Sequence, residues 1–204
     1  MSFPCHSKAQ VHIRISMQDS NRNKVDLAKY DNSWFDPGGK PLKRTLWYFV
    51  NALFMQSHLF PVSSLKVTLL RLFGASIGEG VVIKPCVSVK YPWLLRVGDH
   101  TWIGERVWID NLCLVSIGSH VCLSQGAMLL TGNHDYKKRG FDLVVKGIVL
   151  EDGVWIGAKS MVCPGVTCAS HSVLSAMSMA TSSLEPYSVY SGIPAVRIRE
   201  RNLS

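Results

Sequence analysis

The sequence predicts a parallel β-solenoid, and a repeat of six residues is the observation that predicts it. Between residues 77 and 180 a small or branched apolar side chain recurs at every sixth position, with few interruptions, and a second small side chain follows four residues later. Three short strands per coil make a triangular prism whose narrow interior admits only these two positions, so this short period is typical of a solenoid. The six-residue positions are Ile77, Ile83, Val89, Val97, Ile103, Ile109, Ile117, Leu123, Leu129, Leu150, Ile156, Val162, Cys168, Leu174 and Ala180.

The composition is that of a globular protein with a net positive charge. The chain has 204 residues, of which 47% are hydrophobic, and a formal net charge of +8. No apolar run reaches the roughly 18 residues that cross a bilayer, and residues 1–10 lack the apolar core of a signal peptide. No helix-turn-helix, zinc-finger or RNA-binding motif accompanies the charge, so we expect no nucleic-acid partner.

The cysteines indicate a reduced protein, which we expect to be cytoplasmic. They stand at positions 5, 86, 113, 122, 163 and 168, and none forms a CxxC pair. Scattered cysteines of this kind are typical of a reducing compartment. Cys113 and Cys168 fall on the repeat frame, so we expect both to point into the prism as small apolar side chains.

Residues 1–75 are expected to form an N-terminal extension with two helices, and residues 76–204 the solenoid. Apolar residues recur at helical spacing from Pro41 until Pro61 breaks the pattern, and a second such segment ends at Gly74. The helices can cap the first coil, whose core and strand edges would otherwise be exposed. Residues 41–74 are also basic and rich in aromatic side chains, so peripheral contact with a membrane is an alternative or additional role.

Departures from the repeat mark one corner of the prism. Residues 89–96 and 109–116 each contain two extra residues, so those coils are 20 residues long instead of 18. The next inward position should fall at residue 135, but no suitable side chain occurs before Leu150. We therefore expect a loop of residues 135–149 to leave the solenoid there, and loops on a rigid scaffold are where function tends to be found.

His134, at the root of this loop, is the leading candidate for chemistry. The lengths of the coils place Tyr91, Asp110 and Asn111 at the same corner, one or two coils away, and Asn133 lies beside the histidine. Histidine side chains exchange protons near neutral pH, so this one can act as a general base. The neighbouring polar groups could hold an acceptor that bears hydroxyl groups.

Three further histidines occupy equivalent positions on successive coils. His100, His120 and His171 form this column, and Gly153 takes the fourth position. The position is an outward turn and the column is incomplete, so we expect no metal site. The chain also lacks a Ser–His–Asp arrangement, a P-loop and a GxGxxG motif, which argues against nucleophilic hydrolysis and dinucleotide redox chemistry.

Several motifs resemble those of the hexapeptide-repeat acetyltransferases, which fold as a left-handed parallel β-helix. They include the repeat itself, Gly132-Asn133-His134, Val154-Trp155-Ile156-Gly157-Ala158, Pro164-Gly165-Val166 and Gly192-Ile193-Pro194-Ala195. Within that group, Tyr30-Asp31-Asn32-Ser33-Trp34, Leu46-Trp47-Tyr48 and Trp108-Ile109-Asp110-Asn111 resemble the colanic acid biosynthesis acetyltransferases. Galactoside, maltose and xenobiotic acetyltransferases are related to them.

The resemblance implies an O-acetyltransferase that uses acetyl-CoA, without a metal, to modify a sugar hydroxyl in surface or exopolysaccharide biosynthesis. It implies a homotrimer with sites between subunits, and His134 as the base that deprotonates the acceptor. We expect the corner residues Tyr91, Asp110, Asn111 and Asn133 to bind the acceptor, and by the resemblance Asp110 stands where sugar acetyltransferases carry an asparagine. The residues it implies for acetyl-CoA binding are Gly157, Ala158, Ala176, Thr181, Arg197 and Arg199.

Three residues depart from the pattern of these acetyltransferases. Met177 brings a bulky side chain to the expected acetyl-CoA groove, and Ser182 and Val196 replace basic residues near its nucleotide end. Other functions therefore stay open. The acceptor could be an amino sugar or a xenobiotic, or the β-helix could be a non-catalytic scaffold. The helices in residues 41–74 could also make the protein peripheral at the inner face of a membrane.

Overall fold

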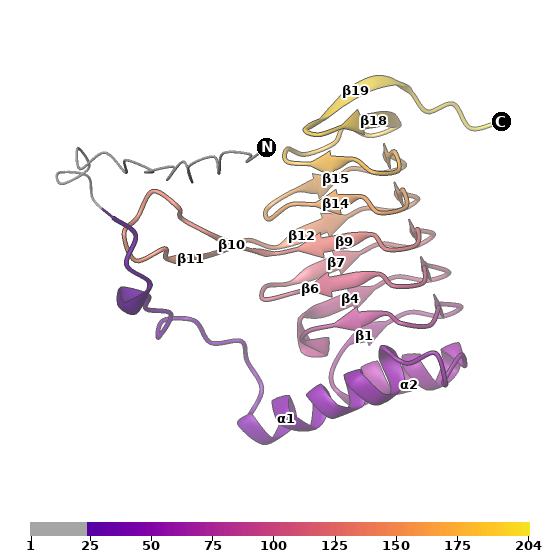
Figure 1. Ribbon diagram of the computed structural model, residues 1–204. Helices are drawn as coiled ribbons and strands as arrows, with labels where there is room; N and C mark the ends of the chain where they lie inside the picture. Colours follow the sequence, from indigo (N-terminus) through magenta and orange to yellow (C-terminus); the bar gives the residue numbers. More distant parts are fainter. Residues whose placement is uncertain (1–23) are drawn as a thin grey trace, which may run out of the picture.

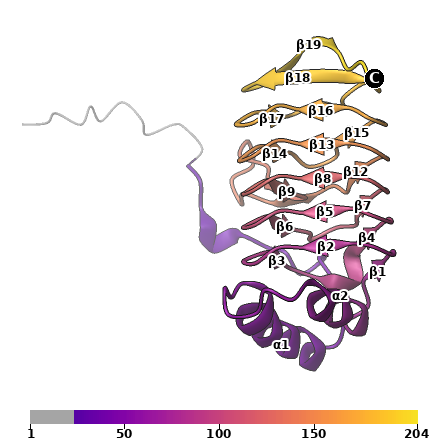
Figure 2. The same ribbon diagram turned by 90° about the vertical axis from the view of Figure 1, so that its right-hand side faces the viewer.

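The computed structural model describes residues 24–204, and Cys5 and the rest of residues 1–23 lie outside the described part. Its main body is a column of stacked parallel coils, with two helices at one end and the C-terminal strands at the other (Figure 1). Seen from the side in Figure 2, the coils lie one above another at an even spacing. The predicted β-solenoid is confirmed.

Three parallel sheets form the faces of the prism, here called faces A, B and C. Face A contains β1 (Ser76–Ile77), β4 (Leu95–Val97), β7 (Val115–Ile117), β12 (Ile148–Leu150) and β15 (Thr167–Cys168). Face B contains β2 (Val82–Ile83), β5 (Trp102–Ile103), β8 (Cys122–Leu123), β13 (Trp155–Ile156), β16 (Val173–Leu174), β18 (Ser188–Gly192) and β19 (Ala195–Glu200). Face C contains β3 (Ser88–Val89), β6 (Trp108–Asp110), β9 (Met128–Leu130), β14 (Met161–Val162) and β17 (Met179–Ala180).

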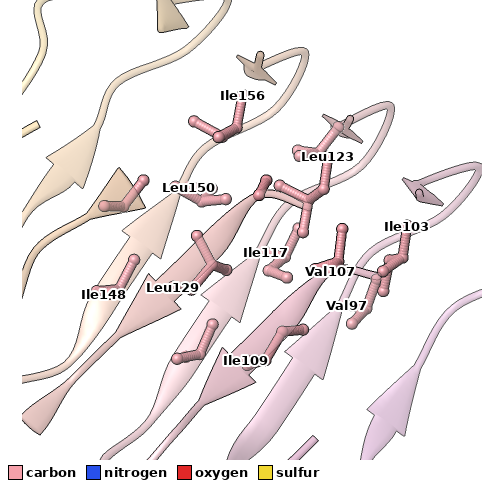
Figure 3. Packing of buried hydrophobic residues seen from close by; sticks show 14 of the residues in the cluster. Val97, Ile103, Val107, Ile109, Ile117, Leu123, Leu129, Ile148, Leu150 and Ile156 are labelled. Carbon is pink, nitrogen blue, oxygen red and sulfur yellow. The ribbon is translucent and has the colours of Figure 1, made fainter. Parts of the chain in front are cut away.

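The interior is filled by the six-residue positions, all of which are buried as predicted. The strand register places equivalent residues above one another, so that Ile103, Leu123 and Ile156 form one apolar column on face B. Figure 3 shows such side chains from neighbouring coils packed along the interior. Cys168 is fully buried, but the inward position expected for Cys113 is wrong. The longer coil bulges at that corner, which leaves Cys113 only partly buried.

Helix α1 (Pro41–Val50), the π-helical turn η2 (Asn51–Met55) and helix α2 (Ser63–Leu72) cover the first coil. Cationic and aromatic side chains from them donate to backbone carbonyls at each of the three faces. These bonds run from Arg71 Nη2 to Ile77 (2.8 Å), from Lys66 Nζ to Lys84 (2.8 Å) and from Trp47 Nε1 to Val89 (2.8 Å). These bonds satisfy one carbonyl acceptor on the open edge of each face.

The segment that leaves the solenoid is an antiparallel hairpin of β10 (Gly132–His134) and β11 (Leu143–Val145). It projects sideways from the corner between faces C and A (Figure 1). The expected bounds of 135–149 are therefore displaced, because residues 148–150 already belong to β12. Pairing of Gly132 with Val145 starts the hairpin two residues after β9 and places His134 within a strand.

Two short 3-10 helices and the final hairpin complete the structure. Helix η1 (Leu27–Lys29) precedes α1, and η3 (Pro92–Leu94) lies at the corner between faces C and A. At the far end, β18 pairs with β16 in parallel and with β19 in antiparallel fashion, so the basic tail forms a strand. Within residues 24–204, no helix combines the length and apolarity needed to cross a membrane.

Candidate active site

The imidazole of His134 is held in a defined orientation by the hairpin. Its Nδ1 lies 2.8 Å from the carbonyl oxygen of Phe141. A carbonyl can only accept a hydrogen bond, so Nδ1 carries a proton, and in the neutral imidazole Nε2 therefore keeps a free lone pair. The ring also stacks on the Phe141 ring, with centroids 4.5 Å apart and planes inclined by 11°. The arrangement presents Nε2 as a proton acceptor.

The hairpin and the N-terminal segment together create this arrangement. Phe141 has a positive φ of 56°, a left-handed backbone conformation that residues other than glycine rarely adopt. In this conformation its carbonyl meets the histidine ring. Across the ring, Tyr30 packs at 5.7 Å between centroids. The backbone N–H of Asp26 donates to the carbonyl of Arg139 at the hairpin tip (2.9 Å). Residues 26–30 are therefore tied to the segment that carries the histidine.

A cavity of about 440 Å³ opens beside His134. Its walls come from the N-terminal segment, helix α1, the solenoid corner and the hairpin. The lining residues are Tyr30, Asn32, Phe35, Pro37, Arg44, Lys90, Tyr91, Leu112, His134 and Leu143. Two cations and no carboxylate line it among the described residues. The wall from residues 30–37 could not be found from the repeat, because these residues lie far from it in sequence.

The structure separates the four predicted acceptor residues. Tyr91 lines the cavity together with His134, as expected of the corner. Asp110 instead lines a neighbouring cavity, where it forms an ion pair with Lys90 (2.9 Å). Asn133 is exposed outside the cavity, and its Oδ1 accepts the His134 backbone N–H (2.8 Å).

Asn111 cannot contact an acceptor directly, because its side chain is completely buried. Its Oδ1 accepts the Tyr91 N–H (3.0 Å), and its Nδ2 donates to the carbonyls of Tyr91 (2.6 Å) and Leu94 (3.1 Å). The expected substrate contact is replaced by a structural role. Asn111 holds the backbone of the longer coil and so positions Tyr91.

A second cavity, of about 610 Å³, lies on face B beside the turns that lead to face C. Four of the predicted acetyl-CoA residues line it: Gly157, Ala158, Ala176 and Arg199. Successive coils approach closely here. A Cβ added to Gly157 would lie 2.4 Å from the Ala176 nitrogen, so this position admits only glycine.

The sequence predicted residues that do not line this cavity and missed others that do. Thr181 and Arg197 do not line it, and Arg197 instead pairs with Glu185 (3.5 Å) and Glu200 (3.6 Å). Met177 is 69% exposed at its turn and also stays outside the lining, so the expected intrusion does not occur. Trp155 and Ser124 were missed, although a tryptophan at an outward repeat position is itself a signal of a binding surface.

Ser182 and Val196, the two other departures, are exposed and do not line this cavity. The described residues contain no group of three or more histidine, cysteine or acidic side chains that could hold a metal.

Burial raises the pKa of the Cys168 thiol to about 12, and desolvation raises the pKa of Cys122 and Cys163. Raised pKa values suppress the thiolate form, so these thiols are poor nucleophiles.

The two cavities have no residue in common and belong to different corners of the prism. One offers a proton acceptor, and the other a groove of small side chains ending near an arginine.

Comparison with known proteins identifies the family. No family model matches the chain. WcaF of Escherichia coli K12, which is named as a colanic acid biosynthesis acetyltransferase, is 39% identical over 164 residues, covering 80% of this chain and 90% of WcaF. The chain belongs to the hexapeptide-repeat acetyltransferases.

Solved structures of this family agree in fold. A hexapeptide-repeat acetyltransferase from Vibrio cholerae, determined with acetyl coenzyme A, has a TM-score of 0.71 and 27% identity, covering 79% of this chain and 88% of its own. A galactoside acetyltransferase in complex with coenzyme A has a TM-score of 0.70 and 28% identity, with coverage of 79% and 82%. The predicted left-handed β-helix and the resemblance to acetyltransferases are confirmed.

Proposed function

We propose that this acetyltransferase transfers the acetyl group of acetyl-CoA to a hydroxyl group of a sugar during polysaccharide biosynthesis. The observation that carries the proposal is the hydrogen bond from His134 Nδ1 to the Phe141 carbonyl, which leaves Nε2 as a base beside a cavity. The family relationship to WcaF supports the sugar acceptor. The bound acetyl-CoA and CoA of the two structural relatives support the donor.

The reaction needs one base and no covalent enzyme intermediate. The acceptor hydroxyl oxygen attacks the thioester carbonyl carbon while His134 Nε2 removes its proton. The tetrahedral intermediate then collapses, the C–S bond breaks, and the CoA sulfur takes the proton from Nε2. The products are an acetyl ester and free CoA, and His134 returns to its starting state.

The face B groove suits the donor. Its narrow part is formed by Gly157, Ala158 and Ala176, whose small side chains leave the backbone accessible to the amide groups of a pantetheine arm. Arg199 lies at the edge of the same groove and forms no ion pair within residues 24–204, so its charge is available to a CoA phosphate.

We further propose that the protein is a homotrimer. The outward positions of face B carry Trp102, Cys122 and Trp155, and the upper part of face C carries Met128, Met161 and Met179. The outward positions of face A are mostly polar, including Ser76, Arg96, Ser116 and Thr167. Two apolar faces that differ from each other favour a closed ring with heterologous contacts. Such a ring would bring the His134 corner of one subunit to the groove of the next.

We also propose that helix α1 contacts an anionic membrane surface. Its inner face is buried on the first coil, yet its outer face is apolar as well. The outer stripe continues from α1 into η2 and consists of Leu42, Leu46, Phe49 and Leu53, which are 51% to 70% exposed. Residues 37–78 contain no aspartate or glutamate, whereas Lys40, Lys43 and Arg44 lie on or next to α1. An apolar stripe flanked by cations is typical of interfacial helices.

Vesicle flotation tests the membrane contact. The full chain should float with vesicles containing phosphatidylglycerol and should bind neutral vesicles less well. Phe49→Glu should abolish flotation, whereas Tyr136→Glu, at an even more exposed aromatic residue on the hairpin, should not. Equal flotation of both variants would refute the role of the stripe.

A transfer assay tests the main proposal and its alternatives. The protein is incubated with acetyl-CoA and a panel of neutral sugars, amino sugars and amine drugs, and free CoA and acetylated products are measured. We expect esters, which hydroxylamine cleaves. Products that resist hydroxylamine would identify an amine acceptor instead. An absence of acetyl-CoA binding would support a non-catalytic scaffold.

A further inference from the structure

The cavity beside His134 continues into a third cavity of about 370 Å³, here called the α1 cavity. The two share Arg44, Lys90 and Tyr91, so they adjoin along the solenoid corner. The α1 cavity extends from this junction toward α1 and the outward side of β6. Combined, the two cavities offer more room than one sugar ring needs next to the base.

The α1 cavity presents surfaces that suit a sugar. Tyr48 of α1 is 69% exposed and Trp108 of β6 is 43% exposed, so both offer aromatic rings to a ligand. Asn51 and Ser88 contribute polar groups nearby. A pyranose has apolar C–H faces and a rim of hydroxyl groups. Aromatic walls with a few polar groups recognise both features.

The junction between the cavities is positively charged. Lys90 is balanced by Asp110, whose carboxylate lies 2.9 Å from its Nζ. Arg44 is half-buried and forms no ion pair with any residue in 24–204. A guanidinium at such a position binds a carboxylate or phosphate through paired, charge-assisted hydrogen bonds. We therefore expect the ligand to carry an anionic group one sugar away from the reacting hydroxyl.

We infer that the acceptor is an acidic oligosaccharide rather than a free neutral monosaccharide. One sugar lies beside His134, a neighbouring sugar packs on Tyr48 and Trp108, and Arg44 binds its carboxylate or an attached phosphate. The inference rests on the proposed function for the identity of the reacting site. It adds a second subsite and a requirement for negative charge.

Direct binding to the full chain tests the anion requirement without acetyl-CoA. Cellobiose, cellobiouronic acid and cellobiose phosphate are titrated by calorimetry. We expect the acidic disaccharides to bind about tenfold more tightly than cellobiose, with the difference shrinking at high salt. The better of the two identifies the anion as carboxylate or phosphate. Arg44→Gln should remove the preference, whereas Lys43→Gln, one residue earlier on α1 and outside both cavities, should keep it.

The aromatic wall is tested with a second pair of variants. Tyr48→Ala should weaken binding of the acidic disaccharide about fivefold, and binding of glucuronic acid by a similar factor, because that sugar occupies the same subsite. Phe49→Ala, the adjacent exposed residue outside both cavities, should affect neither ligand.

Equal affinity for neutral and acidic disaccharides, or a preference that survives Arg44→Gln, would overturn the inference. Failure of the proposed chemistry would look different. His134→Ala should keep the preference for the acidic ligand, so loss of acetyl transfer with retained binding would concern the base alone.

Discussion

Two corners of the prism differ in regularity, and the difference separates their roles. Every turn from face B to face C between successive strands has four residues, from β2 and β3 up to β16 and β17. The connections from face C to face A vary between four residues and the 17 that separate β9 from β12. The regular corner borders the groove of small side chains, and the irregular corner carries His134.

This contrast shows how a repeat protein can obtain a binding groove and a base separately. Identical turns stacked at a fixed spacing expose backbone groups in register, which suits a long flexible ligand arm. A single base needs an individual orientation, and an insertion can provide it through contacts such as that between His134 and Phe141. Because the two corners share no cavity, substitutions can perturb each one separately.

Removal of the base should affect chemistry alone. We expect His134→Ala to lower kcat about a thousandfold, because general-base catalysis is lost. The melting temperature and its increase with acetyl-CoA should stay close to those of the wild type. His120→Ala, at an exposed turn between faces A and B, serves as the control. A kcat within tenfold of the wild type would remove His134 from the reaction.

Adding one methyl group should distinguish the corners structurally. Gly157→Ala would place a Cβ 2.4 Å from the Ala176 backbone nitrogen. We expect a loss of about 2 to 3 kcal/mol in the free energy of unfolding and weaker acetyl-CoA binding. Gly132→Ala would meet only the tip of the Leu112 side chain, which can move, so it should cost under about 1 kcal/mol. Denaturant melts would reveal equal losses if the corners were equally tight.

Charge removal should distinguish two neighbouring arginines of β19. Arg199→Ala should weaken acetyl-CoA binding about tenfold, because one charge-assisted contact is lost. Arg197→Ala should change it less than about twofold, since Arg197 is already paired with Glu185 and Glu200. Calorimetric titration with acetyl-CoA, and with a dephosphorylated analogue, measures both. A larger effect at Arg197 would reverse the assignment.

The smallest expected effect is a change in the free energy of unfolding at alkaline pH, and it comes from a thiol in the buried interior. Burial raises the pKa of Cys168 to about 12 from the ordinary thiol value of 9.0, so the native state keeps a proton that the unfolded chain releases. Its contribution to stability is complete below pH 9 and is lost as pH rises toward about 12. We expect about 1 kcal/mol less stability at pH 10 than at pH 8 in the wild type. Cys168→Ala should show a shallower decline in denaturant melts.

The repeat made the core predictable, whereas competing interactions made the hairpin less so. The narrow interior demands small apolar side chains at a constant interval, so all inward six-residue positions could be named from sequence. The bounds of the hairpin could not, because pairing of Gly132 with Val145 competes with continuation of the repeat. A local pattern does not record which of the two wins.

The candidate site was predicted in part for the same reason. Tyr91 and His134 share a corner because of coil length, which the sequence shows. The burial of Asn111 and the ion pair of Asp110 with Lys90 depend on how the longer coils bulge. The contact of Tyr30 with His134 joins segments that are distant in sequence, and no periodicity announces it.

Mixed assemblies test the central claim, that base and groove come from different subunits. His134→Ala and Ala176→Trp chains are each expected to be inactive alone, the second because a large side chain blocks the groove. Co-expressed in equal amounts, they should recover about a quarter of the wild-type rate, since a random ring unites the intact corner of one chain with the intact groove of another in that fraction of interfaces. A mixture that stays inactive would show that each site is built within a single chain.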